Sequence, residues 1–143
     1  MSGLTLAQAS TIIDAALKKG RDLNLAPLTV VVLDAGGHVT AFEREDGSSN
    51  MRFQIAHGKA HGALALGIGS RALMARAEQQ PSFIAAATAA VGGALIPVPG
   101  GVLIHDDLGA TLGAVGVSGD TSDNDEMAAV AGIEAAGLVA VTG

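Results

Sequence analysis

The segment that decides the fold runs from Leu112 to Gly132 and reads LGAVGVSGDTSDNDEMAAVAG. It predicts an apolar strand over Leu112 to Val117, then an acidic corner, then a last helix over Ser122 to Leu138. Gly113 and Gly116 leave the strand without side chains at two places, which gives room for a ligand or for a neighbouring helix. The segment is not a phosphate-binding loop, because the pattern GxxxxGK is absent.

The acidic corner holds four carboxylates, at Asp120, Asp123, Asp125 and Glu126. They do not follow the residue order of a calcium-binding EF-hand loop. Carboxylates in this place give favourable charge to the start of a helix and accept hydrogen bonds from its free N–H groups. Ser118 precedes them without the GxSxG context of a nucleophilic serine. The corner therefore indicates a helix start rather than a calcium site or a nucleophile.

The composition narrows the class of protein. The chain has 143 residues and no Gly/Ser-rich linker, which fits one domain over residues 1–143. The formal net charge is -6 and only eight residues are Lys or Arg, so we expect no nucleic-acid partner. Cysteine is absent, which excludes disulfides, iron–sulfur clusters, Cys-ligated zinc and thiol nucleophiles. A metal or haem must use other ligands.

The N-terminal sequence MSGLTLAQA lacks the charged and apolar regions of a signal peptide, and no segment is long and uncharged enough to span a bilayer. We therefore expect a cytoplasmic protein without a membrane partner. The mean hydropathy is nevertheless +0.44. A short chain that is unusually apolar often buries its excess apolar surface between subunits, so the composition predicts a homo-oligomer.

Apolar periodicity, turn residues and capping residues predict the remaining elements. Thr5 to Gln8 matches a capping box, which starts a helix over Leu6 to Arg21. The other predicted elements are a hairpin of Leu28 to Leu33 and His38 to Arg44, helices over Phe53 to Gly67, Ser70 to Gln79 and Pro81 to Ala90, and Leu95 to Val98 with Val102 to His105. The last two segments read as two short strands or as one strand with a bent approach. The early hairpin and the late run of strands predict an antiparallel sheet flanked by helices rather than a Rossmann fold.

Four motifs in one order span nearly the whole chain: VVLDAGGHVTAFEREDG (Val31 to Gly47), IAHGKA (Ile55 to Ala60), GGVLI (Gly100 to Ile104) and GAVGVSGDTSDNDEMAAVAG (Gly113 to Gly132). Together they resemble the GlcG/HbpS-like proteins, a family that includes the C-terminal domain of PduO-type adenosyltransferases. The resemblance implies a profilin-like α+β fold with a five-stranded antiparallel sheet, assembled as a homo-oligomer. It also implies haem binding, which some members show, whereas others belong to catabolic operons without a settled activity.

His57 and His61 lie four residues apart on a predicted helix, so their imidazoles share one face. This spacing suits a divalent metal, and either histidine could serve as the axial ligand of a haem; the sequence does not choose between them. The alternative is a pair of partly exposed histidines beside a stripe of alanines.

Two cations are candidates for binding a small anionic ligand. Lys59 lies on another edge of the same helix, where its amine could hold a carboxylate or a haem propionate; the alternative is a lysine that covers a neighbouring apolar side chain. Arg44 lies at a strand end, where its guanidinium could clamp a carboxylate; the alternative is a surface ion pair with Glu43 or Glu45.

The leading hypothesis is a ligand-binding protein with a pocket between the Lys59 helix and the corner from Gly116 to Asp125, which accepts haem or another carboxylate-bearing molecule. Ser118 lies at this corner. Asp125 and Glu126 match the family's acidic pair, and the resemblance implies that they face the pocket. The alternative is a small catabolic enzyme that acts on a hydroxy acid, an aldehyde or a ring-cleavage product. In that case Lys59, Arg44 and a metal held by the two histidines would supply acid-base and electrophilic groups. A purely structural or accessory subunit is the third possibility.

Overall fold

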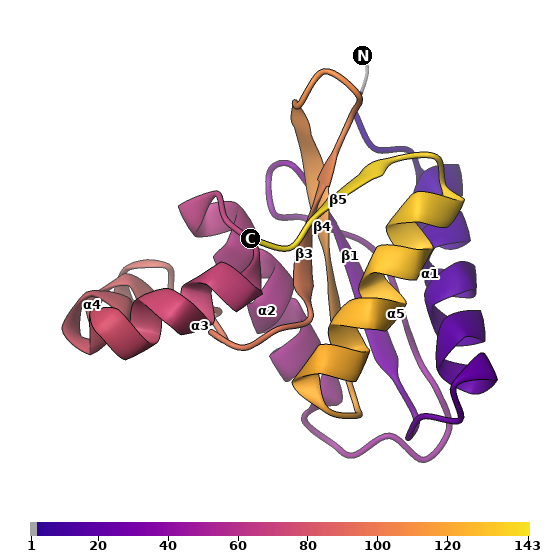
Figure 1. Cartoon of the computed structure of the whole chain (residues 1–143), viewed down its shortest axis with the longest axis horizontal. Helices are drawn as coiled ribbons and strands as arrows, with labels where there is room; N and C mark the ends of the chain where they lie inside the picture. Colours follow the sequence, from indigo (N-terminus) through magenta and orange to yellow (C-terminus); the bar gives the residue numbers. More distant parts are fainter. Residues whose placement is uncertain (1–2) are drawn as a thin grey trace.

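A five-stranded antiparallel sheet with helices on both faces forms the centre of the chain (Figure 1). The computed structural model describes residues 3–143. The strands are β1 (Thr29–Asp34), β2 (Val39–Arg44), β3 (Gly101–His105), β4 (Thr111–Ser118) and β5 (Val139–Val141), in the spatial order β2-β1-β4-β3-β5. The helices are α1 (Leu6–Asp22), α2 (Arg52–Leu66), α3 (Ser70–Gln79), α4 (Pro81–Ala90) and α5 (Ser122–Ala135). The predicted α+β fold is confirmed.

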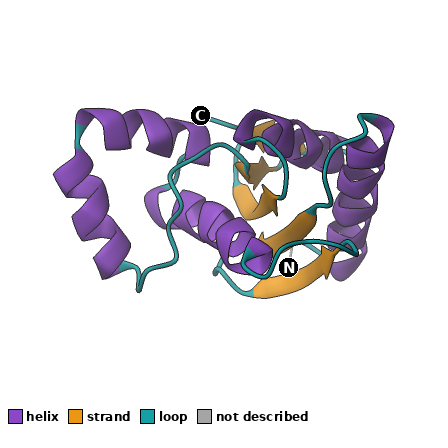
Figure 2. Cartoon of the chain, turned by 90° about the horizontal axis from the view of Figure 1, so that it is seen from below, coloured by secondary structure: helices purple, strands orange, loops and turns teal. Residues whose placement is uncertain are grey.

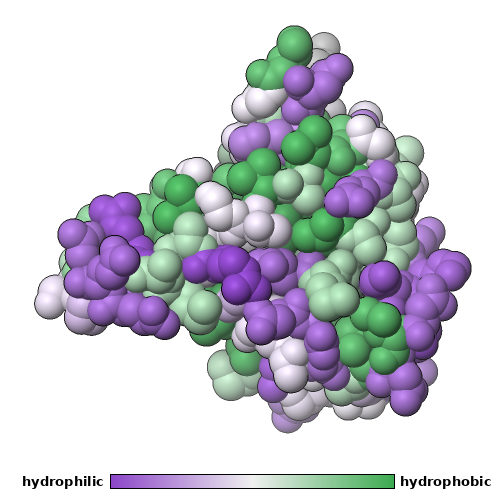
Figure 3. All heavy atoms as spheres, viewed as in Figure 1, coloured by the Kyte–Doolittle hydropathy of each residue, from purple (hydrophilic) through white to green (hydrophobic). Residues whose placement is uncertain are grey.

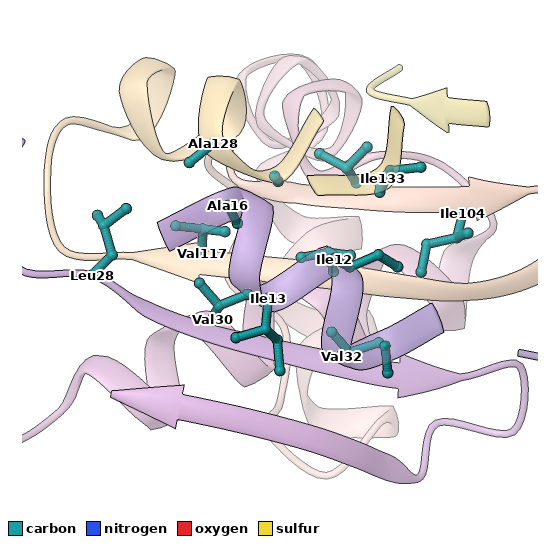
Figure 4. Packing of buried hydrophobic residues seen from close by; sticks show 14 residues of the cluster. Ile12, Ile13, Ala16, Leu28, Val30, Val32, Ile104, Val117, Ala128 and Ile133 are labelled. Atoms are coloured by element: carbon teal, nitrogen blue, oxygen red, sulfur yellow. The ribbon is translucent and has the colours of Figure 1, made fainter. Parts of the chain in front are cut away.

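Helices α1 and α5 cover one face of the sheet. The capping box of α1 is present as predicted, because the hydroxyl of Thr5 accepts a hydrogen bond from the Gln8 N–H while the Gln8 side chain accepts one from the Thr5 N–H. Residues of both helices and of the strands point toward one another in a fully buried cluster, in which Figure 4 labels Ile12, Ile13, Ala16, Leu28, Val30, Val32, Ile104, Val117, Ala128 and Ile133. This cluster is the larger of the two that flank the sheet.

Helix α2 covers the opposite face, so that the sheet lies between helices in Figure 2. Its inner face consists of small residues, among them Ala56, Ala60 and Ala63, which pack on Val31 and other side chains of the sheet. The approach is closest at Gly116, where an added Cβ would lie only 1.9 Å from the Ala56 carbonyl oxygen. Only glycine allows the helix backbone to rest directly on the strand at this position.

At the sheet edge, the structure agrees with one of the two predicted alternatives, a single strand with a bent approach. Leu95–Val98 form no strand, and Gly101–His105 pairs with the sheet; Pro97 and Pro99 have no N–H for a strand ladder, so a second strand is disfavoured here. The predicted continuation of the last helix to Leu138 is wrong, because α5 ends at Ala135. The fifth strand is instead β5, which pairs with β3.

Helix α5 begins at Ser122, as predicted. Thr121 is the N-cap, and its hydroxyl accepts a hydrogen bond from the Asn124 N–H. The Asp120 carboxylate accepts hydrogen bonds from the Ala26 N–H, which is distant in sequence, and from the Asn124 side chain. The corner is therefore built by local capping and by one contact to the chain before β1.

Helices α3 and α4 form an arm that projects from the sheet (Figure 1). A small cluster of Leu73, Ile84 and Leu95 holds the arm together, and Ile84 is the one buried residue of α4. Hydrophilic atoms lie where the arm meets the rest of the molecule in Figure 3. Although α4 is apolar, it has ten residues, and no helix within residues 3–143 has the length and apolarity needed to cross a membrane.

The close approach of α2 to β4 makes a stability prediction. Gly116→Ala places a methyl group against the Ala56 carbonyl, so we expect it to lower the free energy of unfolding by about 3 kcal/mol or more. Urea unfolding followed by circular dichroism measures the change. Gly3→Ala is the matched control, because no atom lies within 4 Å of the added Cβ. Equal stability of the two variants would show that α2 does not rest on the strand at Gly116.

Candidate functional site

A buried ion pair joins α2 to the corner between β4 and α5. Lys59 Nζ lies 3.1 Å from Asp125 Oδ2 and donates a hydrogen bond of 2.8 Å to the Val117 carbonyl. Both side chains are only 2% exposed. The other oxygen of Asp125 accepts a hydrogen bond from the Asp120 N–H. The pair therefore satisfies polar groups of three elements in the interior.

Burial dominates the titration of this pair. It lowers the pKa of Lys59, and the nearby Asp125 carboxylate offsets part of the shift. Burial raises the pKa of Asp125, and the Lys59 ammonium opposes that shift. Because each group compensates the other at hydrogen-bond distance, neither is available to a ligand from solvent.

The predicted pocket between the Lys59 helix and the Gly116–Asp125 corner is therefore filled by the protein itself. Lys59 and Asp125, which the sequence indicated as ligand contacts, are partners of each other. Gly116 contacts the backbone of Ala56. Of the two uses predicted for the strand glycines, room for a neighbouring helix is the one that the structure shows at Gly116.

A row of polar side chains crosses the sheet below the N-terminal end of α2. Arg44, Thr29 and Ser118 are direct neighbours on β2, β1 and β4, so their side chains share the α2 face of the sheet. Arg52 of the first turn of α2 donates from Nη1 to the Ser118 hydroxyl at 2.9 Å. The next row toward the sheet centre, which includes Val31, is apolar. The polar row thus marks the end of the core under α2.

Arg44 does not form the surface ion pair that the sequence offered as one of its two roles. It forms no ion pair with Glu43 or Glu45; its guanidinium donates instead to the carbonyl groups of Ser48 and Ser49, at 2.7 and 3.0 Å. Glu45 pairs with Arg21 and accepts from the Leu28 N–H. The immediate effect of Arg44 is to order the loop that leads into α2.

Four aromatic rings form a stack along the side of α2 that faces β2 and the turn between β1 and β2. Phe42 of β2 meets Phe53 edge-on at a centroid distance of 4.7 Å, Phe53 stacks on His57 at 5.7 Å, and His57 stacks on His61 at 5.4 Å. Desolvation and the nearby His61 lower the pKa of His57, which favours its neutral form. The two histidines share one face, as their spacing predicts.

His61 is held by a hydrogen bond from its Nδ1 to the Ala94 carbonyl at 3.0 Å. Because a carbonyl can only accept, Nδ1 carries the proton and Nε2 keeps a free lone pair. The ring borders a hollow of about 150 Å³ that is also lined by Ala35, Gly36, Gly37, Leu64 and Ala65. A Cβ added at Gly37 would lie 3.8 Å from Nε2, so this nitrogen faces the glycine turn between β1 and β2.

The predicted metal site of His57 and His61 gains no support. Within residues 3–143, no group of three or more His, Asp or Glu side chains is arranged to hold a metal ion. Glu126 forms an ion pair with Arg71 of α3, in which Glu126 Oε2 lies 3.1 Å from Arg71 Nε. Arg71 contacts Asp123 as well. These two carboxylates fasten the arm to the start of α5.

The sequence reasoning missed Thr29 and Arg52. Two signals could have found them. Thr29 is the single polar residue at the start of the otherwise apolar strand TVVVL. Arg52 puts a positive charge in the first turn of a helix, where the positive end of the helix dipole disfavours it.

Comparison with known proteins gives one family and a set of solved structures. The model of the family described as "Haem degrading protein HbpS-like" matches residues 4–134. The chain is 26% identical to protein ORFY of Klebsiella pneumoniae, with a TM-score of 0.84, 94% of this chain and 90% of that chain covered. It is 27% identical to a double mutant of HbpS from Streptomyces reticuli, with a TM-score of 0.80 and coverages of 94% and 87%. The PduOC:haem complex shares the fold, at 23% identity, a TM-score of 0.85 and coverages of 96% and 97%. No curated protein matches the chain.

The buried ion pair predicts a large effect of removing one partner. Lys59→Met leaves the Asp125 carboxylate buried without a cation, and we expect a loss of about 3 kcal/mol or more in the free energy of unfolding. The double variant Lys59→Met/Asp125→Asn removes the unpaired charge and is expected to recover part of this loss. Urea unfolding measures both.

Lys18→Met is the control for this experiment. Lys18 pairs with Asp22 on the surface of α1, where their side chains are 76% and 57% exposed, so its loss should change stability little. If Lys59→Met costs no more than Lys18→Met, the ion pair does not anchor α2.

Proposed function

The chain belongs to the HbpS-like family, and from this premise we propose that it binds haem, with His61 of α2 as the axial ligand of the iron. The family description names haem degradation, and PduOC, which shares the fold, is a haem complex. Family membership alone does not choose a ligand residue. The hydrogen bond from His61 to Ala94 is the observation on which the choice rests.

The state of His61 is the one that iron ligation requires. A metal-binding histidine usually donates its second ring N–H to a carbonyl or carboxylate, which fixes both the tautomer and the orientation of the ring. His61 does this through Nδ1, so Nε2 remains as the donor atom for iron. The neighbouring His57 has no such partner within residues 3–143, and its ring stacks between Phe53 and His61. His57 and Phe53 would then supply flat, apolar contact beside the porphyrin.

The size of the hollow beside His61 limits how a haem could lie there. About 150 Å³ is less than the roughly 300–1,000 Å³ of usual small-molecule pockets. A haem held by His61 would therefore keep part of its surface open on a single chain. Lys59 does not take part, because its amine is enclosed on another side of α2.

Titration with haemin tests the proposal. Purified protein should give a saturable shift of the Soret band at micromolar haemin. His61→Ala should abolish the shift, because it removes the oriented Nε2, whereas His57→Ala should weaken binding and leave a ligated iron spectrum.

His105→Ala is the control, since His105 lies at the end of β3 and its Nε2 shares a hydrogen bond with the Thr111 hydroxyl. Absence of a saturable shift in the wild-type protein would reject haem binding. A shift that survives His61→Ala but not His57→Ala would show that His57, and not His61, binds the iron.

We propose further that the protein acts as a homo-oligomer in which α4 lies at a subunit contact. The segment PSFIAAATAA of α4 has no charged residue, yet Ile84 is its one buried side chain. Such an apolar, small-residue surface favours contact with another protein surface. Phe83 at its start is 41% exposed and lies under the guanidinium of Arg76.

A charge placed on α4 tests this contact. Light scattering coupled to size-exclusion chromatography should give the wild-type protein a mass of at least twice the 14.1 kDa of one chain. Ala86→Glu, at an exposed position of α4, should shift the population toward monomer, whereas Ala7→Glu on the exposed face of α1 should not. A monomeric wild-type protein, or equal effects of both variants, would contradict the proposal.

A further inference from the structure

Two arginines meet at one serine without a carboxylate between them. Arg44 Nη1 donates to the Ser49 carbonyl at 3.0 Å, and Arg52 Nε donates to the Ser49 hydroxyl at 2.7 Å. Neither guanidinium forms an ion pair with a carboxylate in residues 3–143. By contrast, Lys18, Arg21 and other cations of the described chain do have acidic partners. In a chain of net charge -6, this gathering of unpaired positive charge is unusual.

The start of α2 adds to the positive potential at the same place. Arg52 is the first residue of the helix, no side chain caps its N-terminus, and the first turn contains no acidic residue. The free N–H groups and the helix dipole therefore favour an anion here. Burial is the main cause that lowers the pKa of Lys59, and the positive charge of the nearby Arg52 lowers it further. No carboxylate within residues 3–143 forms an ion pair with either guanidinium, although Glu43, Glu45 and Asp46 line a hollow that Arg44 also borders.

A buried hydroxyl without a partner points to the same spot. Thr29 is 0% exposed, and its Oγ1 has no hydrogen-bond partner among residues 3–143. Thr29 lies directly between Arg44 and Ser118 in the sheet register, and Ser118 is the residue that Arg52 contacts. Directly opposed side chains have Cβ atoms about 5 Å apart, so Thr29 lies next to the serine whose hydroxyl Arg52 contacts. A buried hydroxyl left unpaired is costly, which makes a bound acceptor favourable.

We propose that Arg44, Arg52, Thr29 and Ser118 form a binding site for the oxyanion group of a small ligand, a carboxylate or a phosphate, at the N-terminal end of α2. The two guanidiniums supply charge and paired N–H donors, which match the oxygens of either group. The hydroxyls of Thr29 and Ser118 form the floor, and the half-buried Arg52 side chain covers them. The site does not depend on haem and lies nine residues before His61 on α2.

Thermal unfolding of the haem-free protein tests the site, with sodium phosphate and sodium oxalate as separate probes against sodium chloride at equal ionic strength. A ligand that binds only the folded state raises Tm by mass action. We expect at least one oxyanion to raise Tm beyond chloride, and the stronger probe identifies the ligand class. Arg52→Gln should weaken binding of that probe about tenfold, because it removes a charged donor.

Thr29→Val keeps the shape of the side chain and provides a second variant. It should reduce the anion effect without lowering Tm in chloride, since it deletes a hydroxyl that has no partner. Arg76→Gln is the matched control, because Arg76 likewise has no ion pair but lies on α3 against Phe83. Equal Tm in all three salts, or an equal loss of the anion effect in Arg76→Gln, would overturn the proposal. His61→Ala should leave the anion effect unchanged, so this test and the haem titration can fail separately.

Discussion

The ion pair of Lys59 and Asp125 fixes the position of α2, on one face of the sheet, relative to α5, on the other face. The two residues are 66 positions apart, and their contact joins the middle of α2 to the first turn of α5 across the end of β4. A buried ion pair contributes little net stability compared with apolar packing, but it penalises every arrangement in which one charge stays buried alone. It therefore selects one position of α2 on the sheet. The Val117 carbonyl, to which the same amine donates, defines that position along β4.

The small residues of α2 complement this constraint. With Ala56, Ala60 and Ala63 on its inner face and Gly116 beneath, the helix lies close to the strands. Lys59 is the one large side chain of α2 that is fully buried, and it pairs with Asp125. The stack of Phe53, His57 and His61 lies on the side of α2 that faces β2 and the β1–β2 turn, whereas Arg52 lies over the polar row of the sheet. Both proposed sites follow from this division of one helix into an apolar inner face and a functional surface.

Local patterns predicted most of the fold, because α1, the first hairpin and α2 depend on capping, turn residues and periodicity that the sequence displays. The sheet edge was harder. Leu95 to Val98 and Val139 to Val141 are both short apolar segments, and only the second becomes a strand. The prolines at 97 and 99 lack the N–H that a strand needs, whereas Val139 to Val141 pair with β3. The site was harder still. A lysine on an apolar helix looks available to an anion until its partner, 66 residues away in Asp125, is known.

The position of Lys59 also bears on how the two proposed sites relate to each other. Arg52 and His61 are nine residues apart, about 13 Å along α2 at 1.5 Å per residue, and Lys59 lies between them. Binding at one end could influence the other only by moving α2 over the sheet. The ion pair and the contact at Gly116 oppose that movement, since both would be broken by a small shift of the helix. A fold that holds α2 in this way would keep the proposed oxyanion site and the proposed haem site energetically independent.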